Sequence, residues 1–311
     1  MPESVVRAGV VGVGALGRHH ARVWAGVPGA RLVGVHDSDA ARAAEVAAAQ
    51  GCRAYPDLGS LLADTDALSI AVPTVEHHAV ARQALEAGRD VLVEKPITAT
   101  LAEADDLVAC AASRGRILQV GHIERFNPAT AALLTVGRGA RFVEVHRLGS
   151  FSPRSLDVDV VLDLMVHDLD IVLALDGTEP VQIEAVGVPV LTPKVDIANA
   201  RLRFASGLIA NLTASRVSLE KVRKFRVFAP RTYVSADFTA REAQIYKLES
   251  DGGAPRIAAS RQAAPDQEPL RLQIESFARA VAERSTPLVS GQDGRRALAL
   301  ALTILERIAG H

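Results

Sequence analysis

Cysteine is scarce in this chain, which has only Cys52 and Cys110 among its 311 residues. Two thiols are too few for the disulfide framework of a small secreted domain or for a structural zinc site. Thiols stay reduced inside cells, so we expect a cytoplasmic protein. Aromatic residues are scarce as well, at 4%, and the core must be built mainly from Ala, Val and Leu.

Neither sign of charge dominates, because 35 Lys and Arg residues nearly balance 36 Asp and Glu residues. Proteins that bind nucleic acid or an anionic membrane usually carry a clear basic excess. We therefore expect no nucleic-acid partner and no membrane partner, and we expect the ligand to be a small molecule.

Long hydrophobic runs are missing too, since the longest, at residues 297–305, has about half the length that a membrane-spanning helix needs. The N-terminal stretch MPESVVRAGVVGVGALG lacks a basic leader, a long apolar core and a cleavage site, so it is expected to form a strand. With 49% hydrophobic residues and roughly twice the length of a usual domain, the chain is expected to form two globular domains.

In the first part of the chain, short β-branched runs alternate with Ala-rich segments of helical length. The runs predict strands at 5–11, 31–36, 67–72, 90–93 and 117–120, with helices at 16–25, 39–49, 76–87 and 101–113. This alternation is typical of a doubly wound α/β domain, in which helices cover both faces of a parallel sheet.

After residue 122 the pattern changes, so we place a domain boundary between residues 122 and 123. A helix is expected to begin at 127–128, followed by a strand at 141–148 and a helix at 158–175. Several strand-like runs then follow one another without helices, which predicts antiparallel pairing, most clearly between 198–204 and 208–215. Residues 251–269 are expected to form a loop, with helices near 270–283 and 294–308.

The sequence Gly12-x-Gly14-x-x-Gly17 directly follows a predicted strand and opens a predicted helix. Gly12 permits the tight turn, Gly14 lets a pyrophosphate approach the backbone, and Gly17 allows close packing of helix and strand. Asp37 closes the second strand, where a carboxylate accepts hydrogen bonds from the adenosine ribose. The pattern predicts a Rossmann site; the alternative is an ordinary turn between a strand and a helix.

The choice of dinucleotide follows from the same position. The carboxylate of Asp37 would repel a 2′-phosphate, and its neighbours His36 and Ser38 are not the arginine that NADP binding usually recruits. The sequence therefore favours NAD, with NADP as the alternative.

The tripeptide Glu94-Lys95-Pro96 ends an apolar predicted strand. Ligands of open parallel sheets bind beyond the carboxyl ends of the strands, so Glu94 and Lys95 are expected to face the cleft. Lys95 could donate a hydrogen bond to a substrate hydroxyl and stabilise a developing alkoxide. The alternative is a solvent-exposed ion pair in a loop.

In the predicted helix 158–175, a stripe of ionisable side chains is formed by Asp159, Asp163, His167 and Asp170. The rest of the helix is apolar except for Asp168, so the stripe needs either partners or a wet cleft. His167 could act as a general base that Asp163 orients, or the two could be a purely structural pair. No HExxH or CxxC pattern accompanies the histidines, and we expect no metal.

Taken in order, GVGALG, Asp37, Pro73-Thr74 with His77, Glu94-Lys95-Pro96 and Asp163 with His167 resemble the Gfo/Idh/MocA family of oxidoreductases. GHIERFNPA from Gly121 and the helices near Ser276 and Ser290 extend the likeness over nearly the whole chain. The resemblance implies a nicotinamide-binding Rossmann domain at 1–122. It also implies an α+β domain at 123–311 with an open, mainly antiparallel sheet that binds substrate and supports a homodimer or homotetramer.

The resemblance also implies roles for individual residues. The catalytic set would be Lys95, Asp163 and His167. Substrate would be bound by Lys95, His122, Arg125, Arg154 and His167. The cofactor would be contacted by Gly12, Gly14, Ala15, Leu16, Gly17, Asp37, Ser38, Val72, Pro73, Thr74, His77, Glu94 and Lys95.

Within the family, residues 160–175 and GHIERFNPA are most similar to the members that oxidise the 3-hydroxyl of UDP-N-acetylglucosamine. Where many relatives carry a glycine-rich run, this chain has Val160-Val161-Leu162, so inositol or glucose-fructose specificity is not carried over. In this hypothesis His167 removes the hydroxyl proton while hydride passes to the nicotinamide. The alternatives are another polyol or carbonyl substrate, and a regulator that binds NAD without chemistry.

Overall fold

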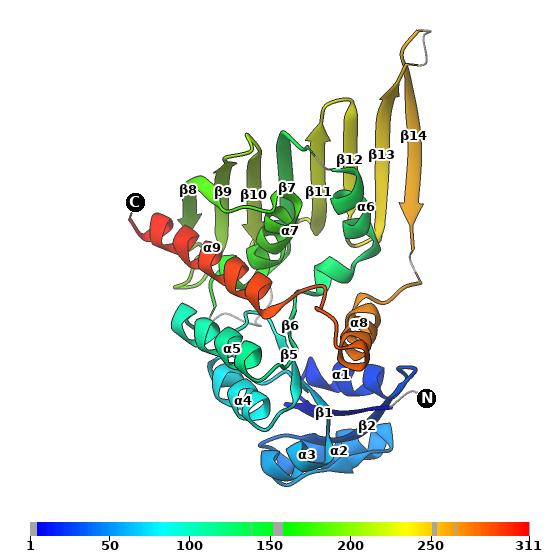
Figure 1. Cartoon of the computed structure of the whole chain (residues 1–311). Coiled ribbons are helices and arrows are strands. Elements are labelled where there is room, and N and C mark those ends of the chain that lie inside the picture. The colour runs from blue at the N-terminus through cyan, green and yellow to red at the C-terminus, as the bar shows by residue number, and fades with distance from the viewer. Residues whose placement is uncertain (1–4, 138, 152–157, 251–253, 265, 311) are drawn as a thin grey trace. The chain divides into compact units, whose positions relative to one another are not determined.

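A computed structural model describes residues 5–137, 139–151, 158–250, 254–264 and 266–310 (Figure 1). The contacts divide the chain into two compact units. Unit 1 comprises residues up to 122 together with 270–295, and unit 2 comprises 123–269 together with the residues from 296 onward. The expected second domain, 123–311, therefore differs from unit 2 in the segment 270–295.

The sheet of unit 1 has six parallel strands in the order β3-β2-β1-β4-β5-β6. They are β1 (Val6–Val11), β2 (Ala30–His36), β3 (Arg53–Ala54), β4 (Ala67–Ile70), β5 (Asp90–Glu94) and β6 (Leu118–Gly121). The order reverses between β1 and β4, which is the arrangement that places a dinucleotide beyond the carboxyl ends of these strands. The α/β fold predicted from the alternating pattern is confirmed.

The helices of this unit begin where the sequence offers caps. Asp39 accepts the N–H groups of Ala41 and Arg42 at the start of α2, and Thr100 forms a capping box with Glu103 at the start of α5. The helices are α1 (Gly17–Trp24), α2 (Ala40–Gln50), α3 (Leu58–Asp64), α4 (Thr74–Glu86), α5 (Leu101–Ser113) and α8 (Pro269–Glu283).

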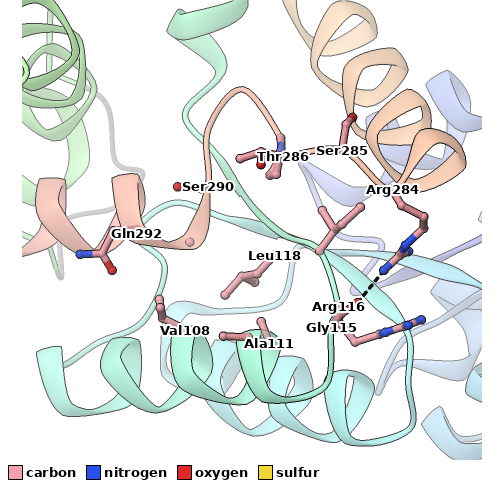
Figure 2. Close-up of a pocket in the computed structure, with 14 residues that line it drawn as sticks. Val108, Ala111, Gly115, Arg116, Leu118, Arg284, Ser285, Thr286, Ser290 and Gln292 are labelled. Carbon is pink, nitrogen blue, oxygen red and sulfur yellow. Dashed lines mark hydrogen bonds between the residues drawn. The ribbon is translucent and has the colours of Figure 1, made fainter.

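Residues 270–295 join unit 1 because they complete its core and its sheet edge. Phe277 of α8 packs edge-on against the buried Trp24 ring, with ring centroids 6.1 Å apart. The N–H of Val120 in β6 donates to the carbonyl of Val289 at 3.0 Å. The loop after α8 thus borders β6, as Figure 2 shows for Ser290 and Leu118.

Unit 2 contains an eight-stranded sheet in the order β14-β13-β12-β11-β7-β10-β9-β8. Its strands are β7 (Phe142–Leu148), β8 (Pro180–Val188), β9 (Ile197–Phe204), β10 (Ile209–Ser215), β11 (Val222–Ala229), β12 (Thr232–Asp237), β13 (Glu242–Glu249) and β14 (Arg256–Ala263). β7 and β10 pair in parallel, and the other neighbours are antiparallel. The mainly antiparallel sheet is therefore confirmed.

One face of this sheet carries the core of the unit. It is covered by η1 (Ile123–Phe126), α6 (Pro128–Val136), the π-helical segment η2 (Val161–Met165), α7 (Val166–Asp176) and the later part of α9 (Gly291–Ala309). Alternate residues of β7, β9 and β10 are buried against the helices, and the residues between them face the other way. No helix among the described residues covers the second face of the sheet.

The prediction of a loop at 251–269 is wrong for residues 256–263, because these residues form the strand β14. This strand pairs with β13 in register from Glu242 opposite Ala263 to Glu249 opposite Arg256. Most of its side chains are exposed, so its sequence lacks the hydrophobic alternation that identifies a half-buried strand. Backbone hydrogen bonds to β13, which no local pattern encodes, hold it in place.

Candidate functional site

The glycine turn lies between β1 and α1. Gly12 has φ +78°, and a Cβ there would lie 2.8 Å from the backbone nitrogen of Val72. A Cβ on Gly17 would overlap the carbonyl oxygen of Gly12, so two of the three glycines are required by the fold itself. A Cβ on Gly14 would meet only Arg42 Nη1, at 3.9 Å. The turn therefore leaves room at Gly14, beside the first amides of α1, for the phosphates of a dinucleotide.

Asp37 is buried at the end of β2, where it closes this turn. Its Oδ2 accepts the N–H of Val13 at 2.7 Å, and its Oδ1 accepts the N–H of Asp39 at 2.9 Å. Arg42 Nη1 lies 3.4 Å from Asp37 Oδ1 and pairs through Nη2 with Asp39. The sequence did not single out Arg42, although its position in the first turn of the helix that Asp39 caps was a usable signal. Ala15, Leu16 and Ser38 are exposed beside these residues.

His77 joins two further segments that the sequence assigns to the cofactor site. Its Nδ1 lies 2.9 Å from the carbonyl of Pro96, and its Nε2 lies 3.0 Å from the carbonyl of Val72. Burial lowers the pKa of His77, although the two carbonyls act in the opposite direction. The imidazole thereby ties the turn at Val72, Pro73 and Thr74 to the segment after β5.

Glu94 is buried at the end of β5 and is not a solvent-exposed residue of a loop. Its Oε1 lies 3.1 Å from Nε2 of the fully buried His20, and its carboxylate packs so close to Gly121 that no Cβ fits there. Burial alone would raise the pKa of Glu94, but His20 and Lys95 lower it below its usual range. The next residue, Lys95, is half-buried, and its backbone N–H donates to Glu94 Oε2 at 3.3 Å. The sequence did not identify His20 as the partner of Glu94, although His20 lies on the buried face of α1 with Gly17, Ala21 and Trp24.

In unit 2, the pair Asp163 and His167 spans a change in helix type. Asp163 is half-buried on η2, and His167 is buried on the first turn of α7. A π-helical turn is wider than an α-helical one and often occurs at functional sites. The two residues therefore lie on adjacent turns of a helical segment that changes type between them.

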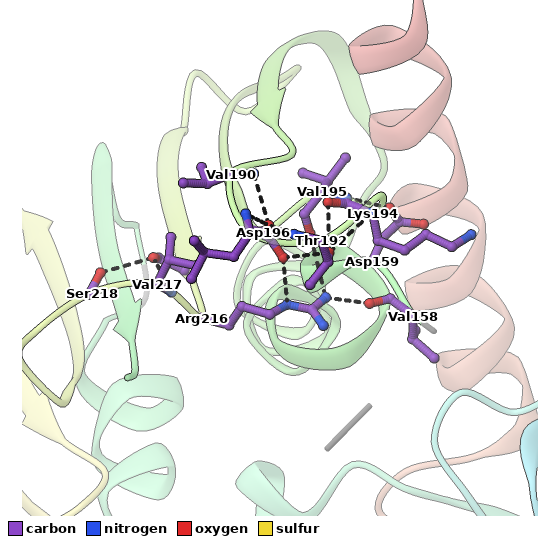
Figure 3. A network of polar contacts seen from close by, with 12 residues as sticks. Val158, Asp159, Val190, Thr192, Lys194, Val195, Asp196, Arg216, Val217 and Ser218 are labelled. Atoms are coloured by element: carbon purple, nitrogen blue, oxygen red, sulfur yellow. Dashed lines mark hydrogen bonds and ion pairs between the residues drawn. The ribbon is translucent and has the colours of Figure 1, made fainter. Parts of the chain in front are cut away.

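The start of this helical segment is fixed by a polar network (Figure 3). Oδ2 of buried Asp196 accepts the N–H groups of Val190, Leu191 and Thr192 at 2.6–2.8 Å. Burial would raise the pKa of Asp196, but these donors lower it to about 2. Arg216 Nε lies 3.6 Å from Asp196 Oδ1, and its Nη2 donates to the carbonyl of Val158.

The same network includes a residue of the predicted stripe. Asp159 Oδ1 accepts the N–H of Val195 at 2.9 Å, and the Asp159 carbonyl accepts the N–H of Asp163 at 3.0 Å. The loop before β9 is thus connected to the turn that carries Asp163. Asp159 therefore has a hydrogen-bond partner within the protein, which is one of the two ways in which a carboxylate of the polar stripe can be accommodated.

A second network explains the polar exception on the apolar side of α7. Arg147 donates through Nε and Nη2 to both oxygens of Asp168 at 2.7 and 2.8 Å, and through Nη1 to Glu124 at 2.9 Å. Burial alone would lower the pKa of Arg147, but the two carboxylates raise it and keep the side chain charged. This buried trio holds η1 to the residue that follows His167.

The predicted substrate-binding residues are distributed as follows. The side chain of Arg125 is 8% exposed, with Nη1 3.2 Å from Asp170 Oδ1, so its charge is already matched by a carboxylate within unit 2. His122 is buried at the end of unit 1, and Arg154 lies outside the described residues. Lys95 belongs to unit 1, whereas Asp163 and His167 belong to unit 2. Their joint action stays a prediction.

No group of three or more His, Cys, Asp or Glu side chains within the described part of the chain could hold a metal ion. Among the same residues, no helix combines the length and the apolar character needed to cross a bilayer.

Comparison with known proteins now adds to this geometry. The profile described as "Oxidoreductase family, NAD-binding Rossmann fold" matches residues 6–122, and that of the "GFO/IDH/MocA C-terminal domain" matches residues 139–234. The chain belongs to the Gfo/Idh/MocA oxidoreductase family. It is an NAD-dependent dehydrogenase whose first unit binds the cofactor, as its sequence predicted.

Relatives within the Gfo/Idh/MocA family include a UDP-N-acetylglucosamine 3-dehydrogenase of Acidithiobacillus ferrooxidans. It is 46% identical over 303 residues, which cover 96% of both proteins. Its solved structure matches with a TM-score of 0.91 at 43% identity over 98% of each chain. An inositol 2-dehydrogenase of Rhizobium meliloti is 28% identical over 98% of this chain and 97% of its own length. Levoglucosan dehydrogenase, solved with NADH and levoglucosan, shares the fold at 18% identity over 98% and 97% of the chains, with a TM-score of 0.87.

Proposed function

We propose that the chain oxidises the 3-hydroxyl of UDP-N-acetylglucosamine and transfers the hydride to NAD. The observation that carries this proposal is the 46% identity, over 96% of both proteins, to an enzyme named for that reaction. Lys95, Asp163 and His167 supply a hydrogen-bond donor, a carboxylate and a base of the kinds that this reaction needs, and Val160-Val161-Leu162 stands where many family members are expected to carry a glycine-rich run.

In the proposed reaction His167 accepts the proton of the substrate hydroxyl, and Asp163 orients the imidazole. Lys95 donates a hydrogen bond to the same oxygen and stabilises its developing negative charge. Bound NAD supplies the acceptor for the hydride. The networks around Asp196 and Arg147 hold the backbone before Asp163 and after His167, and we expect them to limit movement of the base.

The direct test is NAD reduction, followed at the nicotinamide absorbance, with UDP-N-acetylglucosamine, UDP-glucose, glucose and inositol. We expect turnover with the nucleotide sugar alone. His167→Asn should lower turnover by about 100-fold or more, because a general base contributes that much, while NAD affinity stays within about twofold. His78→Asn, which changes a partly exposed histidine of α4, is the matched control and should retain activity.

The other outcomes of this test select other functions. Turnover with inositol alone would favour a polyol dehydrogenase, which the inositol 2-dehydrogenase relatives support as a second candidate. NADH binding without turnover of any substrate would favour a regulator. Full activity of His167→Asn would remove this residue from the mechanism.

We also propose that the protein is a homodimer or homotetramer that forms through the open face of unit 2. Four aromatic side chains cross this face as a stacked row, with centroid distances of 5.6, 4.8 and 5.7 Å: Phe142, Phe228, Tyr233 and Tyr246. At the sheet edge, Ile257 of β14 is 73% exposed. Exposed apolar rows and uncovered strand edges are surfaces that a second chain can cover.

The cytoplasm is the proposed location. Cys52 and Cys110 are both free thiols in the structure, and each is partly buried. Burial raises the pKa of the Cys52 thiol, which makes it less reactive. A chain with such thiols suits a reducing compartment.

A further inference from the structure

Two neighbouring cavities lie in unit 1 near the amino ends of the sheet strands, whereas the glycine turn follows the carboxyl end of β1. One, of about 350 Å³, is bordered by the starts of β1 and β5, by residues 66 and 116, and by the end of α8. The other, of about 450 Å³, lies between α5, β6 and residues 284–292 (Figure 2). Arg116 and Arg284 line both cavities. Because β1 has six residues, its amino end is roughly 17 Å from the glycine turn at its carboxyl end.

Charge in the first cavity is not balanced. Three guanidinium groups line it, those of Arg89, Arg116 and Arg284, together with the carboxylates of Asp66 and Asp90. Arg284 Nη1 donates to Asp90 Oδ2 at 2.5 Å, and Asp66 Oδ1 accepts from Arg7 Nη2, outside the cavity, at 2.7 Å. Both carboxylates therefore already have a basic partner.

Among the residues that the structure describes, the other two guanidinium groups form no ion pair with an acid, although Arg89 helps to lower the pKa of Asp66 through its charge. Arg116 donates to the backbone carbonyls of Gly88 and Arg114, both at 3.2 Å, and to no other group within the described ranges. Arg89 Nε is buried and has no hydrogen-bond acceptor among the residues that the structure describes. A buried donor without an acceptor costs free energy, and an anion in the cavity would supply the missing acceptor.

We infer that this cavity binds the phosphate group of a small phosphorylated molecule. Planar guanidinium groups match phosphate oxygens with paired, charge-assisted hydrogen bonds, and a cavity lined by more guanidinium groups than carboxylates suits an anion. The second cavity is lined by Val108, Ala111 and Leu118, so it can hold an apolar group attached to that phosphate. Such a site would be separate from the dinucleotide site, and phosphate would bind there whichever substrate the enzyme oxidises.

The test is calorimetric titration of the full chain with inorganic phosphate and with phenyl phosphate, at an ionic strength held constant with sodium chloride. We expect both to bind, and phenyl phosphate to bind about tenfold more tightly because its ring enters the second cavity. Equal affinities would remove the second cavity from the site. If neither inorganic phosphate nor phenyl phosphate binds, the whole inference is overturned.

Two sets of variants test whether phosphate binds in this cavity. Arg89→Gln combined with Arg116→Gln should weaken phosphate binding about tenfold or more, whereas Arg114→Gln, which changes an exposed arginine outside the cavity, should not. Ala282→Glu adds a carboxylate at the exposed end of α8 without removing any contact, and it should weaken binding as strongly. Ala282→Gln, of the same size but neutral, should bind as the wild type does.

NADH binding serves as the check that each variant is folded. Phosphate binding that survives in both the double arginine variant and Ala282→Glu would assign the anion to another place and overturn the inference. Because the readout is binding of phosphate and not turnover, failure of the proposed dehydrogenase activity would leave this result unaffected.

Discussion

At the scale of single residues, Asp37 combines two roles. Its carboxylate accepts two backbone N–H groups that shape the glycine turn, and it lies where the adenosine ribose of NAD is expected. Arg42 sits beside it and partly offsets its charge. We therefore expect the preference for NAD over NADP to depend on a pair of opposite charges, of which the sequence predicted only the acid.

Replacing Asp37 by Asn should weaken NADH binding by about 10- to 100-fold, because hydrogen bonds to a charged group contribute about 1.5–3 kcal/mol. NADPH binding should weaken less, since the repulsion of its 2′-phosphate disappears and Arg42 remains. Fluorescence titration with both cofactors measures the two affinities. Equal losses for NADH and NADPH would show that Asp37 shapes the turn without selecting the cofactor.

At the scale of elements, the helical segment that carries Asp163 and His167 depends on a loop from elsewhere in the chain. The N–H groups of residues 190–192 converge on Asp196, and Arg216 links this carboxylate to the carbonyl of Val158. Sequence periodicity predicted the helix and its polar stripe. It could not predict the π-helical turn, because that geometry follows from contacts with residues more than 30 positions away.

We expect Asp196→Asn to lower the free energy of unfolding by about 2 kcal/mol at pH 7, because an amide accepts fewer of the converging N–H groups. The folded pKa, about 2, is below the usual 3.8, so the stabilisation is present above pH 4 and is lost as the pH falls toward 2. Denaturant melts of both proteins at pH 7 and pH 3 should therefore show a smaller difference at the lower pH.

Asp266→Asn, which changes an exposed carboxylate, is the control and should alter stability by less than about 0.5 kcal/mol. A difference between the wild type and Asp196→Asn that stays constant from pH 7 to pH 3 would contradict the linkage to this carboxylate.

At the scale of the whole molecule, the two units have different exposed surfaces. The sheet of unit 1 is buried between helices, as parallel sheets are, whereas the sheet of unit 2 presents one face and the edge strand β14 to solvent. An uncovered face with a row of stacked aromatic rings explains why we propose assembly through unit 2.

Light scattering should give a mass of two or four times the 32.9 kDa of the single chain. The double variant Tyr233→Glu with Ile257→Glu should reduce this mass to that of one chain, because charges are costly to bury in an apolar interface. Gln83→Glu, which adds a charge to the exposed surface of α4, should leave the assembly intact. A monomeric wild type would contradict the proposed assembly.

The sequence alone determined the glycine turn, the acid after β2 and the alternation of strands and helices, because each depends on local conformation or on short spacings. Tertiary structure decided which charges meet: Glu94 with His20, Arg147 with Asp168 and Glu124, and Arg42 with Asp37. It also decided that residues 270–295 return to unit 1 and that β14 is a strand. Most of these features arise from pairs far apart in the chain, whose partners become identifiable only when the backbone brings them together.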